Sequence, residues 1–117
     1  MFFLGLDIGC FALTELRHGS NAKNIQTRAD FDIDSREFIL NTPTEADMKC
    51  WIGASAHLAN MAVVWAQLYI KNKHYGVQPF LVPLRDKKDH TVLEGITIGD
   101  CGSKVGLVKR NKLVVIE

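Results

Sequence analysis

The sequence lacks a charge imbalance, a cysteine framework and a long apolar run, and each absence excludes a class of protein. Lys and Arg total 14 and Asp and Glu total 13, so no net field attracts a nucleic-acid backbone. Cys10, Cys50 and Cys101 form no CxxC pair, which argues against a disulfide framework or a zinc site. The longest apolar stretch, Met61 to Ala66, is far shorter than the ~20 residues of a membrane-spanning helix. We therefore expect no nucleic acid, no structural metal and no membrane span.

The sequence also lacks the short motifs of common catalytic and nucleotide-binding sites. It contains no G-x-S-x-G, H-E-x-x-H, Walker A or G-x-G-x-x-G motif. His18, His57, His74 and His90 each fall in a different expected loop, where a lone histidine is usually a surface residue. We therefore assign no catalytic residue to this chain.

Helical periodicity is scarce, and short segments in which apolar and polar residues alternate with period two dominate the pattern. Residues 25–32 alternate in this way, which predicts a strand with one wet face. Residues 32–35 predict a turn, and residues 37–42 predict a second strand with Phe38 and Leu40 inward. Together these segments predict a hairpin.

The rest of the chain adds further strands. Met61 to Ile70 is apolar on both faces, which predicts a central strand, with a helix as the alternative. Val77 to Arg85 carries two prolines, which belong at a sheet edge or a bulge. Gly95 to Gly99 and Lys112 to Ile116 predict two short strands. The sequence thus predicts an all-β fold, a small antiparallel β-barrel or sandwich, in one domain over residues 1–117.

Two segments place small and polar residues directly after apolar strands, where a flat ligand can approach the backbone. Residues 10–21 contain Thr14 and then a His-Gly-Ser turn, and residues 48–53 contain Trp51 close to Gly53. Threonine offers a hydroxyl beside exposed N–H groups, and the tryptophan offers an aromatic wall. Taken alone, Thr14 is better explained as a β-branched strand residue than as a ligand contact, and Trp51 can be a core or rim aromatic and an aromatic wall at once.

These segments resemble the acyl-CoA oxidases, relatives of the acyl-CoA dehydrogenases. GCFALTELRHGSN, from Gly9 to Asn21, is similar to the central signature of that family. The resemblance implies the middle β-domain, which in the family is packed between two helical domains and holds one side of the isoalloxazine ring of FAD. Further segments match the family in order: Ile25–Thr27, Glu37–Pro43, Lys49–Gly53, Tyr75–Asp86 and Gly95–Asp100.

The resemblance also implies individual roles. Thr14 matches the threonine whose hydroxyl and amide contact the polar edge of the flavin, and Gly53 matches a second flavin contact. Trp51 matches the aromatic wall against the ring. Leu13 is implied beside the cofactor in the same turn, which also contains Glu15. Ser20, with Gly19, is implied near the acyl-CoA and the phosphate region of FAD; the alternative for Ser20 is a turn residue that caps its own backbone.

The implied parent reaction converts fatty acyl-CoA and O2 to trans-2-enoyl-CoA and H2O2 in fatty acid β-oxidation, with FAD as cofactor. The family's base is a glutamate of the C-terminal helical domain, and no residue of this chain corresponds to it, so we expect the chain alone to be inactive. The implied partners are FAD and fatty acyl-CoA, and the implied assembly is a homodimer. The implied location is the peroxisome, although the chain ends without the peroxisomal tripeptide. The alternative location is the cytoplasm.

Three departures from the family pattern leave alternatives open. Arg17 stands where the family often has Gly or His, Cys50 replaces the first of two tryptophans, and Val108 to Glu117 is unlike the family's continuation. These departures favour a stand-alone β-barrel interaction module that has lost flavin binding. A third alternative is an acyl-CoA dehydrogenase that passes electrons to a protein acceptor, although the His-Gly-Ser-Asn turn is closer to the oxidases.

Overall fold

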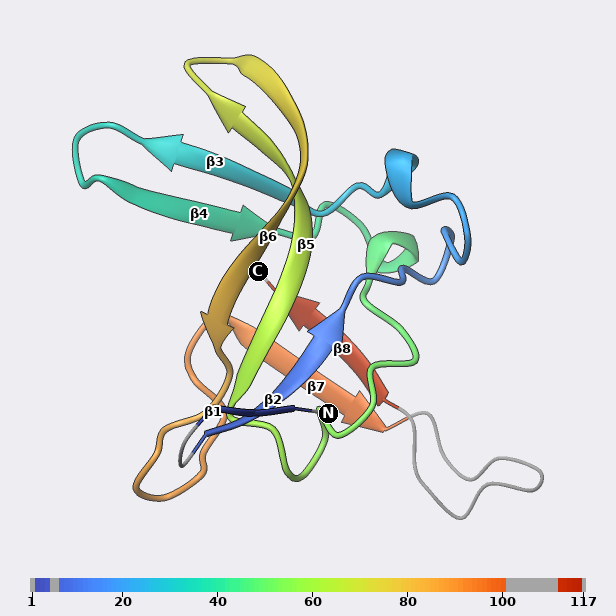
Figure 1. Ribbon diagram of the computed structural model, residues 1–117, viewed down its shortest axis with the longest axis vertical. Coiled ribbons are helices and arrows are strands. Elements are labelled where there is room, and N and C mark those ends of the chain that lie inside the picture. Colours follow the sequence, from blue (N-terminus) through green and yellow to red (C-terminus); the bar gives the residue numbers. More distant parts are fainter. Residues whose placement is uncertain (1, 5–6, 101–111, 117) are drawn as a thin grey trace.

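The computed structural model describes residues 2–4, 7–100 and 112–116 of the chain (Figure 1). Strands dominate it, and its only described helices are two short 3-10 segments, η1 (Ala22–Asn24) and η2 (Glu45–Asp47). No described helix has the length and apolarity needed to cross a membrane. The strands are β1 (Phe2–Leu4), β2 (Asp7–Ala12), β3 (Arg28–Asp32), β4 (Glu37–Asn41), β5 (Met61–Ile70), β6 (Lys73–Pro83), β7 (Ile96–Asp100) and β8 (Lys112–Ile116).

Strand β5 organises the main sheet, which confirms the predicted central strand and excludes the helical alternative. Its first half, from Met61 to Val64, pairs in parallel with β2, and its second half, from Gln67 to Ile70, pairs in parallel with β3. Strand β6 runs antiparallel along β5. Ala62, Val64 and Ala66 of β5 are fully or almost fully buried, as a strand at the centre of a sheet requires.

The all-β prediction is confirmed, but the prediction of purely antiparallel pairing is wrong. The sheet is mixed, with the path β1-β2-β5-β3-β4 and with β6 paired to β5. Parallel pairs need long crossover connections, and the one from β3 to β5 consists of β4 and residues 42–60. This connection includes residues 48–53, the second predicted site segment. The loop that the parallel pairing requires is therefore also the loop that carries half of the predicted site.

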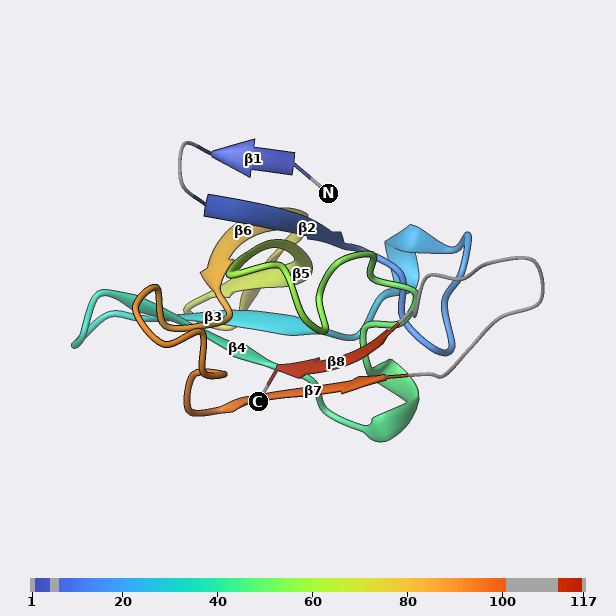
Figure 2. The ribbon, with the colours of Figure 1, turned by 90° about the horizontal axis from the view of Figure 1, so that it is seen from below.

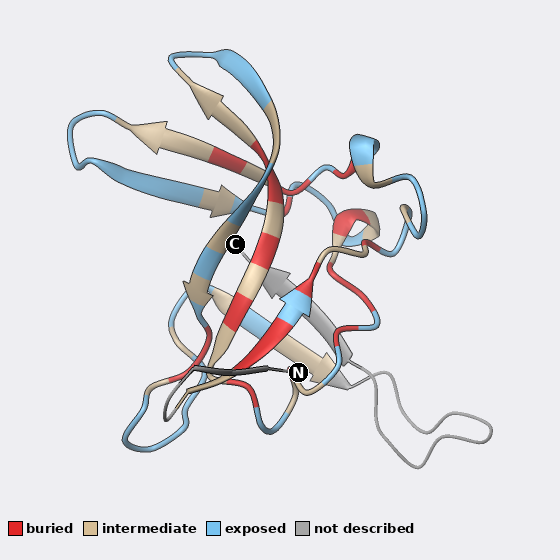
Figure 3. Ribbon diagram, viewed as in Figure 1, coloured by how far each residue is buried: buried red, intermediate tan, exposed pale blue. Residues whose placement is uncertain are grey.

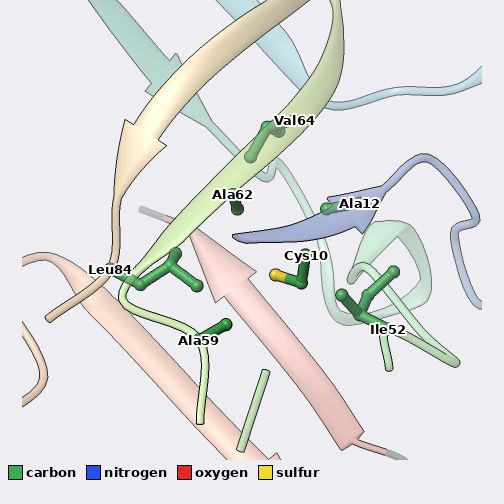
Figure 4. Close-up of a cluster of buried hydrophobic side chains, with 7 residues drawn as sticks. All are labelled: Cys10, Ala12, Ile52, Ala59, Ala62, Val64 and Leu84. Atoms are coloured by element: carbon green, nitrogen blue, oxygen red, sulfur yellow. The ribbon is translucent and has the colours of Figure 1, made fainter. Parts of the chain in front are cut away.

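A second, two-stranded sheet of β7 and β8 forms a separate layer (Figure 2). Ile96 and Ile98 of β7 pack against the main core, so the two layers enclose it. The predicted strands near residues 95–99 and 112–116 are thus present. The core side chains are mostly small, which lets the layers approach closely (Figure 4): Cys10, Ala12, Ile52, Ala59, Ala62, Val64 and Leu84.

The β3–β4 hairpin has the predicted turn and strands, although its outer end is less buried than expected (Figure 3). Phe38 was expected inward, but its side chain is 46% exposed. Its ring packs against Phe31 at 5.1 Å and against Phe80 at 5.2 Å between centroids. The outer end of the hairpin projects beyond the β7–β8 layer (Figure 1), which agrees with the exposure of Phe38.

Strand β6 confirms one prediction and corrects another. It contains Pro79 and Pro83 and, among the described residues, pairs only with β5, as expected of an edge strand with prolines. His74 was expected in a loop but lies in β6, where its ring stacks on Tyr69 with centroids 4.8 Å apart. The single-sequence pattern missed it because the β5–β6 turn has only two residues, Lys71 and Asn72, and β6 resumes at once.

Candidate functional site

The two predicted site segments, remote in sequence, are joined by backbone hydrogen bonds. The amide of Cys50 donates to the carbonyl of Thr14 at 2.8 Å, and the amide of Leu16 donates to the carbonyl of Met48 at 2.9 Å. Between them, Glu15 and Lys49 form an antiparallel bridge. The structure therefore brings Thr14 and the 50–53 segment together at one corner, beyond the end of β2.

The 50–53 segment is anchored by Ile52 and exposes its two neighbours. Ile52 is 2% exposed and belongs to the core, whereas Trp51 is 57% exposed and Gly53 is also exposed. A Cβ atom added at Gly53 would meet nothing within 4 Å, so the space beside this backbone is open. Trp51 has a φ of 64°, a left-handed conformation that bulky residues rarely adopt and that often marks functional sites.

Thr14 and Leu13 follow the buried Ala12 and are both partly exposed. The carbonyl of Thr14 is occupied by Cys50, but its amide and hydroxyl have no hydrogen-bond partner among the described residues. The side chain of Leu13 lines an open, mainly apolar pocket of about 200 Å³ together with Trp65 and Val77. This corner thus combines two available polar groups with an apolar wall.

Gly19 and Ser20 lie in the excursion that the chain makes between β2 and β3, residues 13–27, and both are exposed. The carbonyl of Ser20 accepts a hydrogen bond from the amide of Ala22 at 3.0 Å. Within the described part of the chain, no hydrogen bond joins Gly19 or Ser20 to Thr14. The structure therefore groups Thr14, Leu13, Trp51 and Gly53 at one corner, and leaves the other two predicted residues on a neighbouring turn.

A buried carboxylate closes the excursion that carries this turn. Glu15, 1% exposed, accepts hydrogen bonds from the amides of Gln26 (2.7 Å) and Thr27 (2.8 Å) and from the Thr27 hydroxyl (2.7 Å). Burial alone raises the pKa of Glu15, but these hydrogen bonds and the charge of Lys49 together lower the pKa below its usual value. Glu15 is therefore a carboxylate that fastens residue 15 to residues 26 and 27.

Lys49 is the buried cation that accompanies this carboxylate. Its side chain is fully buried, and its Nζ donates to the carbonyl of Leu13 at 2.9 Å and to Oε1 of Glu15 at 3.3 Å. Burial lowers the pKa of Lys49, whereas the charge of Glu15 and the hydrogen bond to it act in the opposite direction. The ammonium thus contacts the peptide group that precedes Thr14.

A second acid near the turn is also neutralised within the protein. Nη2 of Arg17 contacts Oδ1 of Asp47 at 2.5 Å, and the hydroxyl of Thr44 donates to the other oxygen at 2.6 Å. Nδ1 of His18 lies 3.2 Å from Oε2 of Glu15. Glu15, His18 and Asp47 have the spacing of a metal site, with ligand atoms within 4.8 Å of one another. Because Lys49 and Arg17 already contact the two carboxylates, this cluster is explained as a protein-internal ion-pair network.

Arg85 fixes the backbone that follows Gly53. Its guanidinium is buried and donates to the carbonyls of Ser55 (2.6 Å), Ala56 (2.5 Å) and Ala59 (2.5 Å). Lys49 and Arg85 therefore hold the chain on either side of the Trp51–Gly53 corner. Sequence reasoning missed both roles, because lysine and arginine are rarely fully buried and neither stands in a pattern that signals burial.

Comparison with known proteins identifies the family. Residues 10–114 match the family model of the acyl-CoA dehydrogenase middle domain, so the chain belongs to that family. It is 52% identical over 98 residues to an acyl-coenzyme A oxidase of Eremothecium gossypii, an alignment that covers 84% of this chain and 13% of that protein. It is 51% identical over 98 residues to an acyl-coenzyme A oxidase of Caenorhabditis elegans, with 84% and 15% covered.

Solved structures give the same result. The crystal structure of acyl-CoA oxidase1 from Yarrowia lipolytica superposes with a TM-score of 0.93 and 43% identity, over 96% of this chain and 17% of that one. Acyl-CoA oxidase-2 of C. elegans, bound with FAD, ascaroside-CoA and ATP, superposes with a TM-score of 0.90 and 44% identity, over 97% and 17%. The resemblance found in the sequence is thus confirmed, and the chain spans a small part of each relative.

Proposed function

We propose that this chain is the flavin-contacting β-domain of an FAD-dependent acyl-CoA oxidase, and that residues 1–117 belong to that one domain. The observation that carries the proposal is the backbone pairing of residues 14–16 with residues 48–50, which brings Thr14 and the Trp51 corner together. The matched family and the FAD-bound relative support it. The identity to oxidases over most of the chain does not favour the interaction module or the dehydrogenase.

The residues of the corner suit the proposed cofactor. The Thr14 amide and hydroxyl are donors without a partner among the described residues, and a reduced flavin carries negative charge at its polar edge. The exposed indole of Trp51 and the open backbone at Gly53 offer a wall and a close approach for a planar ring. When bound, FAD supplies the hydride acceptor in the proposed reaction.

The substrate, assembly and location are part of the same proposal. We assign fatty acyl-CoA as the substrate class, with the catalytic glutamate outside these residues, and place Gly19 and Ser20 toward the acyl-CoA and the FAD phosphates. The C. elegans relative bound with ascaroside-CoA supports an acyl-CoA ligand. Homodimeric assembly and a peroxisomal location follow from the family resemblance alone.

The test is an FAD titration followed by amide chemical shifts in heteronuclear NMR. We expect the amides of Thr14, Trp51 and Gly53 to shift, and those of the β3–β4 turn at residues 33–36 to stay in place. Thr14→Ala removes one donor and should weaken FAD binding about threefold to tenfold. Thr97→Ala, at an exposed strand position, is the matched control. Saturable binding that shifts the turn but leaves the corner unchanged would contradict the proposal.

A further inference from the structure

The placement of Lys49 has a consequence for the Thr14 amide. Nζ of Lys49 donates to the carbonyl oxygen of Leu13, and this carbonyl belongs to the same peptide unit as the N–H of Thr14. A peptide whose oxygen accepts a charged hydrogen bond is polarised, and its N–H becomes a stronger donor. The buried ammonium and the amide proposed to contact the flavin therefore act through one planar group.

We infer that Lys49 is a positioning residue of the flavin site, whose ammonium polarises the Leu13–Thr14 peptide and so strengthens the Thr14 N–H as a donor to a negatively charged ring edge. The inference rests on the proposed function for the identity of that ring. Its first half, the polarised peptide, is a property of this chain alone.

The geometry favours this role over that of a simple counterion for Glu15. The Lys49 ammonium is nearer to the Leu13 oxygen, at 2.9 Å, than to the Glu15 oxygen, at 3.3 Å. The side chains of Lys49 and Glu15 are fully buried. In such surroundings a charge acts more strongly on a neighbouring dipole than it does in water.

The direction of the Thr14 N–H is also fixed. The carbonyl of Leu13 is held by Lys49 on one side, and the carbonyl of Thr14 is held by the Cys50 amide at 2.8 Å on the other. The amide between them cannot rotate without breaking one of these bonds. A donor that is fixed before its ligand arrives needs no reorganisation when charge develops, which is the condition for electrostatic stabilisation.

Removal of Lys49 or Glu15 alone leaves the other as a buried charge without its counterion and risks unfolding, so the main comparison is between the unaltered chain and the double variant Glu15→Gln/Lys49→Met. The double variant removes both charges together. We expect the Leu13 carbonyl carbon and the Thr14 amide nitrogen and proton to move upfield in the double variant relative to the unaltered chain. Lys88→Met, at an exposed turn, removes the same charge elsewhere and should leave these resonances in place. Unchanged Leu13 and Thr14 resonances in a folded double variant would overturn the inference.

Flavin binding gives a second readout. We expect the double variant to bind reduced FAD about threefold to tenfold more weakly than the unaltered chain does, with a smaller change for oxidised FAD. Equal changes for the two forms would refute the donor role. If the unaltered chain binds neither form, the proposed function fails while the chemical shifts still decide the polarisation. If the double variant does not fold, the unaltered chain supplies the test. A scalar coupling between Lys49 Nζ and the Leu13 carbonyl carbon would support the hydrogen bond through which Lys49 polarises the peptide, and its absence would contradict the inference.

Discussion

Replacement of Arg85 by methionine should release the backbone after Gly53 and destabilise the whole fold. The guanidinium donates three short hydrogen bonds, to the carbonyls of Ser55, Ala56 and Ala59. Each carbonyl left without a partner costs about 1–3 kcal/mol when buried, and removal of a buried cation returns part of that sum. Because Ala56 is partly exposed, water can replace one bond. We therefore expect a loss of about 3–5 kcal/mol in the free energy of unfolding.

The assay is urea unfolding followed by tryptophan fluorescence and circular dichroism. With a slope of about 2 kcal/mol per molar urea, this loss lowers the midpoint by about 2 M. Native-state hydrogen exchange should show earlier opening of the Leu58 and Ala59 amides, which donate to the carbonyl of Ala54. Arg36→Met, in the exposed β3–β4 turn, is the control and should leave the midpoint unchanged. A midpoint in Arg85→Met equal to that of the control, with both amides still protected, would refute the role of Arg85.

Three further outcomes follow from buried groups and turn geometry. Because the pKa of Glu15 is lowered in the folded protein, its contribution to stability is present above the unfolded value of 4.5 and is lost as the pH falls through the folded pKa. The urea midpoint of the unaltered chain should therefore fall at acid pH, and it should fall less steeply in Glu15→Gln. Burial raises the pKa of the Cys10 thiol to about 11, so iodoacetamide near pH 8 should label Cys10 only after unfolding, and mass spectrometry of native protein labelled at Cys10 would contradict its burial. Lys71 and Asn72 both have positive φ in a two-residue hairpin turn, so the double change Lys71→Asn/Asn72→Gly should raise the urea midpoint by an amount equivalent to about 0.5–1 kcal/mol, whereas a lowered midpoint would exclude this turn type.

The sequence predicted those parts of the structure in which local pattern and burial agree. Alternation around Ile25, Thr27 and Ala29 places these residues inward, and all three are buried. Continuous apolarity from Met61 onward marks the central strand for the same reason. The parallel pairing was missed because alternation reports which face a side chain occupies and carries no information about the direction of the neighbouring strand.

The candidate site was predictable through its motifs, and its supporting groups were not. Thr14 and Trp51 stand out as polar or aromatic residues after apolar runs. Lys49 and Arg85 are charged, and composition alone assigns charged residues to the surface. Their burial becomes intelligible only from the acceptors around them, which come from residues 13 and 15 for Lys49 and from residues 55–59 for Arg85.

The position of the site follows from the way in which two strands share one side of β5. Strand β2 pairs with residues 61–64 of β5, and β3 pairs with residues 67–70 of the same strand. The chain therefore leaves the sheet after β2 and returns at β3, further along β5. Glu15 ties the start of this excursion to residues 26 and 27 at its end, and the 48–50 segment adds a short ladder beside it. The amides of residues 15–18 are hydrogen-bonded within the protein, whereas the Thr14 amide has no partner among the described residues, and the contact of Lys49 with the Leu13 carbonyl fixes where that amide points. The proposed flavin suits this arrangement, because its negatively charged edge can accept from the Thr14 amide and hydroxyl.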